Sequence, residues 1–79
     1  MRSEFSVALA AAVFKSEATQ SSIARELEVS TAYLSDMKLG NRHPTPRFVN
    51  KLCVWLGCGL RDKTQWHVLG ARTRGWEVL

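Results

Sequence analysis

Small and polar side chains gather in one short segment of this 79-residue chain, between Ser30 and Gly40. The side chains of this kind are Thr31, Ala32, Tyr33, Ser35, Asp36 and Lys38. Hydroxyl groups donate and accept hydrogen bonds at the edges of base pairs, a carboxylate accepts from a cytosine amino group, and a small methyl group contacts a thymine methyl. An ammonium group binds phosphate. The segment therefore carries side chains suited to contacts with nucleic acid.

A helix over residues 31–39 would present these side chains together. Leu34 and Met37 lie three residues apart and supply the apolar inner face of such a helix. Ser30 precedes it as an N-cap, and Gly40 follows it as a residue that tolerates the left-handed backbone of a helix end. The polar side chains then lie on the other faces.

A second short helix is expected just before this one. Thr19 is its N-cap, residues 20–27 form the helix, and its inner face is made by Ile23, Ala24 and Leu27. Glu28 and Val29 make the turn. Two short helices joined by a tight turn form a helix-turn-helix, in which the first braces against the DNA backbone and the second inserts its N-terminal side chains into the major groove.

Apolar residues at helical spacing predict three further helices. Residues 3–15 carry an apolar stripe behind a Ser3 cap, and residues 46–56 follow a Thr45 cap with Pro46 in the first turn. Residues 62–73 are expected to begin with a capping box of Asp62 and Gln65. The inner face of this last helix consists of Trp66, Leu69 and Val68.

The fold class is therefore all-α, a compact bundle of four to five helices in one domain over residues 1–79. Residues 75–79 form either a short strand or an extended arm. The apolar surplus near the end of the chain suggests a dimerisation segment at 62–79. The interface residues would be Trp66, Leu69, Trp76, Val78 and Leu79.

The stretch from Thr19 to Pro44 resembles the Cro/CI-type (XRE-type) helix-turn-helix of phage and bacterial repressors, a lambda-repressor-like fold. The matching positions are Gln20, Ile23-Ala24, Leu27, Val29-Ser30, Leu34-Ser35, Gly40, Arg42, Pro44 and the helix from Phe48 to Leu56. The resemblance implies a sequence-specific transcriptional regulator, a repressor by analogy, that binds operator DNA as a homodimer in the cytoplasm.

The resemblance also assigns contacts. Base edges would be contacted by Thr31, Ala32, Ser35 and Asp36, and Tyr33 could reach a base or a phosphate. Phosphates would be contacted by Gln20, Lys38, Asn41, Arg42 and Arg47, because of their positions beside the predicted 31–39 helix. Each of the residues expected to contact phosphate could instead be simply exposed to solvent. Asp36 could brace Lys38 or Arg42 instead of contacting a base. Glu28 departs from the family, because glycine is usual at this position of the turn. Either Glu28 adopts a left-handed conformation at some cost, or the turn differs slightly from that of the family. The glutamines with which many relatives read adenine are missing, so no operator sequence carries over.

The charge distribution agrees with a polyanionic partner. Residues 37–79 hold eight basic and two acidic residues, a net charge of +6, whereas residues 1–36 hold three basic and five acidic residues. A basic surface of this kind suits phosphate contact, although it is equally consistent with a solvated face. Glu26, Glu28 and Asp36 support a second hypothesis, a protein-binding module that acts as an antitoxin or sequesters another regulator.

Other function classes find little support. Cys53 and Cys58 with His43 and His67 lack the spacing of a zinc site, so we expect no metal and a reduced intracellular chain. No nucleophile–base pair and no phosphate-binding loop is present in the sequence, so we expect no enzyme activity and no cofactor. The apolar run at residues 7–14 is too short to span a bilayer, so we expect no membrane partner.

Overall fold

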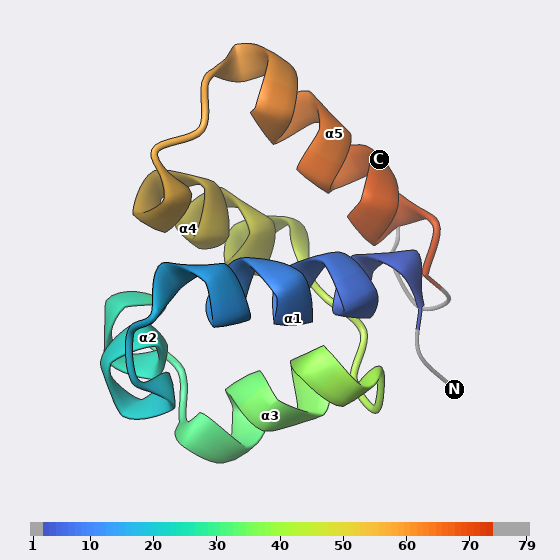
Figure 1. Cartoon of the computed structure of the whole chain (residues 1–79). Helices are drawn as coiled ribbons and strands as arrows, with labels where there is room; N and C mark the ends of the chain where they lie inside the picture. The colour runs from blue at the N-terminus through green and yellow to red at the C-terminus, as the bar shows by residue number, and fades with distance from the viewer. Residues whose placement is uncertain (1–2, 74–79) are drawn as a thin grey trace.

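The computed structural model describes residues 3–73, which form five helices and no strand (Figure 1). The helices are α1 (Glu4–Ser16), α2 (Gln20–Glu26), α3 (Thr31–Leu39), α4 (Pro46–Leu56) and α5 (Leu60–Ala71). In Figure 1 α1 crosses the middle of the molecule, with α3 on one side and α4 and α5 on the other. The predicted all-α bundle is confirmed, while the predicted strand or arm at residues 75–79 lies outside the described residues.

Hydroxyl side chains begin four of the helices. The hydroxyl oxygens of Ser3, Thr19, Ser30 and Thr45 each accept a hydrogen bond, 3.0 to 3.1 Å long, from the backbone N–H three residues on. Each such cap contributes about 1 kcal/mol of stability because it satisfies a donor that the helix itself leaves unpaired. All four predicted caps are confirmed, and they place the starts of α1 to α4 within one residue of expectation.

The predicted start of the last helix is wrong. α5 begins at Leu60 with Gly59 as its N-cap, two residues before the expected capping box of Asp62 and Gln65. Glycine has no side chain to accept a hydrogen bond, so α5 has no side-chain cap. Asp62 lies within the first turn instead, where its negative charge interacts favourably with the helix dipole.

A left-handed residue ends each of the first four helices. Gly40 and Gly57 follow α3 and α4 with φ of 80° and 69°. Glu17 and Glu28 play the same part after α1 and α2, each with φ of 59°. In the turn after α2 the backbone N–H of Val29 donates to the carbonyl oxygen of Ala24 at 2.9 Å, which closes the helix end. Of the two alternatives for Glu28, the structure shows the left-handed conformation, which allows this hydrogen bond to close the end of α2.

One apolar core joins the first four helices. Its fully covered side chains include Phe5, Leu9, Ile23, Leu27, Leu34, Met37, Val49 and Leu52. α5 packs on the outside of this core, and its apolar residues Trp66 and Leu69 are only half-buried there. The Trp66 ring meets Phe5 edge-on at a centroid distance of 5.7 Å. Val68, predicted to line the inner face of the last helix, is instead 41% exposed.

Within residues 3–73 no helix combines the length and the apolar character needed to cross a membrane.

Candidate nucleic-acid interface

The side chains on the side of α3 that faces away from the core are mostly uncharged. An α-helix turns by about 100° per residue, so Leu34 and Met37, both fully buried, define the inner side of α3. The side chains on the opposite side, which we call the outer face, are Thr31, Ala32, Ser35, Asp36 and Leu39. Thr31, Ala32 and Leu39 are exposed, and Ser35 and Asp36 are half-buried. Four of the five residues predicted to contact bases thus lie together.

Lys38 borders the outer face on the side of α2. Its Nζ donates a hydrogen bond to Oε1 of Gln20 at 2.6 Å. The Gln20 Nε2 donates in turn to the backbone carbonyl oxygen of Thr31 at 3.2 Å. One glutamine at the start of α2 therefore fixes the start of α3 and holds the ammonium group of Lys38. Gln20 and Lys38 are both predicted phosphate contacts, and the structure brings them together at this edge.

Arg42 borders the outer face on the side of α4. Its guanidinium carbon lies 4.6 Å from the centroid of the Tyr33 ring, and one guanidinium nitrogen lies 4.0 Å from a carboxylate oxygen of Asp36. Both ionic side chains remain about half exposed, so this pair contributes little to stability. Of the two cations that Asp36 could brace, Arg42 is the one beside it.

Tyr33 lies at this same edge and not on the outer face. Its ring packs against Phe48 of α4 at a centroid distance of 5.8 Å, and the residue is half-buried. The Arg42 guanidinium lies over the same ring, since cations are attracted to aromatic faces. Tyr33 therefore supports Arg42 in this structure, in addition to any contact with a ligand.

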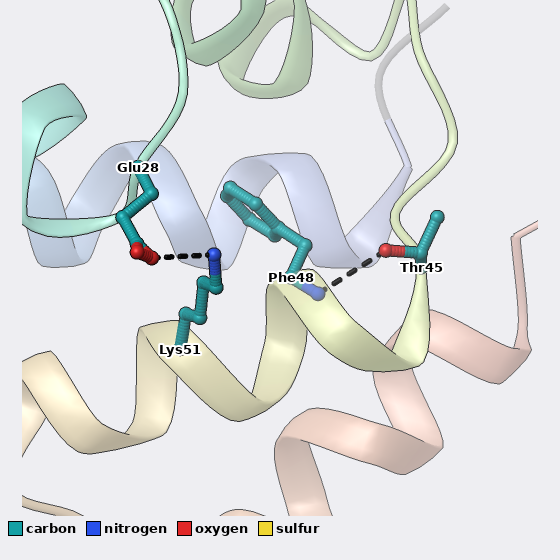
Figure 2. Close-up of polar contacts among 4 residues, drawn as sticks. All are labelled: Glu28, Thr45, Phe48 and Lys51. Carbon is teal, nitrogen blue, oxygen red and sulfur yellow. Dashed lines mark hydrogen bonds and ion pairs between the residues drawn. The ribbon is translucent and has the colours of Figure 1, made fainter.

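α4 braces the turn between α2 and α3. Lys51 points from α4 toward Glu28, and its Nζ donates a hydrogen bond to the Glu28 carboxylate at 2.9 Å (Figure 2). Figure 2 also shows Thr45, which caps the start of the same helix. The hydrogen bond from Lys51, its charge and that of Arg47 lower the pKa of the Glu28 carboxyl group. Glu28, the turn residue with a left-handed backbone conformation, is thus linked to α4 through its side chain.

The remaining predicted phosphate contacts follow α3. Asn41, Arg42 and Arg47 are all exposed. The backbone N–H of Asn41 donates to the carbonyl oxygen of Asp36 at 2.9 Å, which completes the end of α3 and fixes where Arg42 leaves the helix. These three side chains surround the C-terminal end of α3 and the first turn of α4.

Leu39 is a residue of the site that sequence reasoning misses. The sequence pattern places it only at the end of the helix, yet it is 44% exposed and lies near the middle of the outer face. The angular register of α3 contains this information, because Leu39 follows Ala32 by about two full turns.

The predicted dimer interface is only partly described. Trp66 and Leu69 pack against the core of their own chain, and Trp76, Val78 and Leu79 lie outside the described residues. The exposed apolar side chains of α5 are Leu60, at 82%, and Val68.

Cys53 and Cys58 are free thiols at the end of α4. Burial, and next the neighbouring Cys58 thiol, raise the pKa of Cys53 to about 11. Across residues 3–73 no three histidine, cysteine or acidic side chains come together as a metal site would require.

Comparison with protein-family models, with curated proteins and with solved structures finds no match to this chain.

Proposed function

We propose that this protein binds double-stranded DNA by inserting the outer face of α3 into the major groove. One observation carries the proposal: the outer face has a positively charged side chain along each of its two long edges, Lys38 on one and Arg42 on the other. The major groove, about 12 Å wide, admits one α-helix and has phosphates along both of its sides. The two cations therefore match the two phosphate strands.

The partners of both cations suit this role. Lys38 is held by a neutral glutamine, so its charge stays available to a phosphate. Arg42 is held against a neutral ring and near one carboxylate whose contact is long. Between the cations, Thr31, Ala32 and Ser35 are small enough to let the helix backbone approach base edges closely. Thr31 and Ser35 supply hydrogen bonds there.

The biological role that we propose is a transcriptional repressor acting as a homodimer in the cytoplasm. This part rests on the resemblance of residues 19–57 to Cro/CI-type regulators, whose two subunits bind half-sites one helical turn apart. We favour DNA over a basic protein as the partner. One of the three acidic residues behind that alternative, Glu28, is already engaged by Lys51 at 2.9 Å.

The test is selection of preferred duplexes from a random pool, followed by affinity measurements at several salt concentrations. We expect the selected duplex to bind more tightly than random DNA. The logarithm of its affinity should fall with the logarithm of salt by about 0.9 for each phosphate contacted. Absence of any preferred duplex at low salt would overturn the proposal.

Two variants with the same change of charge sharpen this test. Arg42→Ala should weaken binding to all duplexes and lower the salt slope by about 1. Arg61→Ala removes another exposed arginine, from α5 and away from the outer face, and should leave the slope unchanged. Equal effects of the two variants would point to a diffuse electrostatic attraction instead of a docked α3.

A further inference from the structure

Leu39 is a large apolar side chain in the middle of a surface that we propose to face DNA. The core does not account for it, because Leu34 and Met37 already cover the inner side of α3 with no exposed area. Leu39 remains 44% exposed on the opposite side. Ala32, also exposed, precedes it by seven residues, close to two helical turns, so the two side chains lie along one line of the helix.

We infer that Leu39 and Ala32 select thymine by contacting its C5-methyl group. This inference rests on the proposed function and names the feature of the duplex that the outer face reads. The thymine methyl is the apolar group that base pairs present in the major groove. Leucine offers no hydrogen-bond donor or acceptor, so against a phosphate it would displace water without replacing its hydrogen bonds.

The geometry of α3 sets the spacing of the two thymines. Seven residues advance an α-helix by about 10 Å, and one base pair advances B-DNA by about 3.4 Å. With α3 along the groove, the two methyl groups therefore belong to base pairs about three steps apart, on either strand. The polar groups between them, Ser35 and Asp36, face the intervening pairs.

The test replaces thymines of the selected duplex by deoxyuridine, one at a time, which removes only the methyl group. Two replacements about three base pairs apart should each weaken binding about three- to fivefold, the effect of losing one buried methyl group. Leu39→Ala should weaken binding to the thymine duplex and make the protein indifferent to uracil at one of the two positions. Sensitivity at the other position should remain.

The control is Val68→Ala, which truncates a comparably exposed apolar residue on α5 and should keep the full response to uracil. A selected duplex that binds with a steep salt dependence, yet responds to no uracil replacement, would overturn this inference and leave the proposed function standing. An equal response to uracil in wild type and Leu39→Ala would also overturn it. Failure to select any duplex would overturn both.

Discussion

The Nζ of Lys38 lies 2.6 Å from Oε1 of Gln20, across the boundary between α3 and α2. The same glutamine donates to the carbonyl oxygen of Thr31, so one side chain controls both the first residue of α3 and a cation at its edge. The edge of the outer face on this side is therefore built before any ligand arrives. Preorganisation of this kind lowers the entropy that binding must otherwise overcome.

Gln20→Ala removes both hydrogen bonds. We expect DNA affinity to fall about three- to tenfold, since one net hydrogen bond is worth about 1 kcal/mol, with the preferred sequence unchanged. Ser21→Ala alters the adjacent exposed residue of α2 and serves as the matched control. Fluorescence anisotropy with the selected duplex measures both variants. A changed base preference in Gln20→Ala would mean that Gln20 itself reads bases.

The two left-handed glutamates provide a second prediction. Glu17 and Glu28 share φ of 59°, but Glu28 also holds the Lys51 ion pair. Glu17→Gly should raise the free energy of unfolding by up to about 1 kcal/mol, because glycine adopts this conformation without strain. Glu28→Gly relieves the same strain but removes the ion pair with Lys51, so the gain in stability should be smaller.

Urea unfolding of the two glycine variants compares them directly. The order expected is Glu17→Gly above Glu28→Gly in stability. The reverse order would show that the Lys51 contact stabilises neither the turn nor its attachment to α4.

The Glu28–Lys51 pair should also make stability depend on pH. The pKa of Glu28 is lowered in the folded protein, so the pair adds stability at pH values above the ordinary pKa of glutamate. This contribution is lost as the pH falls through the lowered folded-state value. The gap in urea midpoint between wild type and Glu28→Gln should therefore close on acidification, and added salt should narrow it at neutral pH.

A gap that stays constant from neutral to acidic pH would contradict this account of the pair. Glu26→Gln provides the matched control, since Glu26 is an exposed glutamate of α2 without the Lys51 contact. This control variant should keep the acid dependence of the wild type.

The two thiols should differ in reactivity. Cys53 is 4% exposed and its pKa is raised to about 11, so roughly 0.1% of it is thiolate at pH 8. With iodoacetamide at that same pH, the Cys58→Ser variant should react slowly until urea unfolds it, and the Cys53→Ser variant should react readily. Mass spectrometry follows both reactions. Rapid alkylation of Cys53 in the folded protein would show that the end of α4 opens easily.

Local signals in the sequence are enough for most helix boundaries. The caps at Ser3, Thr19, Ser30 and Thr45 could be predicted because a cap depends on one side chain and the backbone just after it. The start of α5 could not, because Gly59 caps it without a side chain while Asp62 and Gln65 mimic a capping box. The sequence thus matches a capping box two residues after the helix has already begun.

The candidate site is less predictable than the helices that carry it. The outer-face residues follow from helical periodicity and from the family resemblance. The partners of Gln20, and the packing of Arg42 on Tyr33, depend instead on how α2, α3 and α4 pack. Contacts such as Lys51 with Glu28 span 23 residues, and no local rule anticipates them. The position of Leu39 on the outer face is overlooked when Leu39 is regarded only as the last residue of the helix. Its angular position relative to Ala32 reveals it.

The central claim is that the outer face of α3 enters the major groove, and NMR of the complex with the selected duplex tests it most directly. We predict intermolecular NOEs from the methyl groups of Ala32 and Leu39 to base protons in the major groove, including thymine methyls. Contacts to DNA made by α1 or α5, with no NOE from the outer face of α3, would contradict the account.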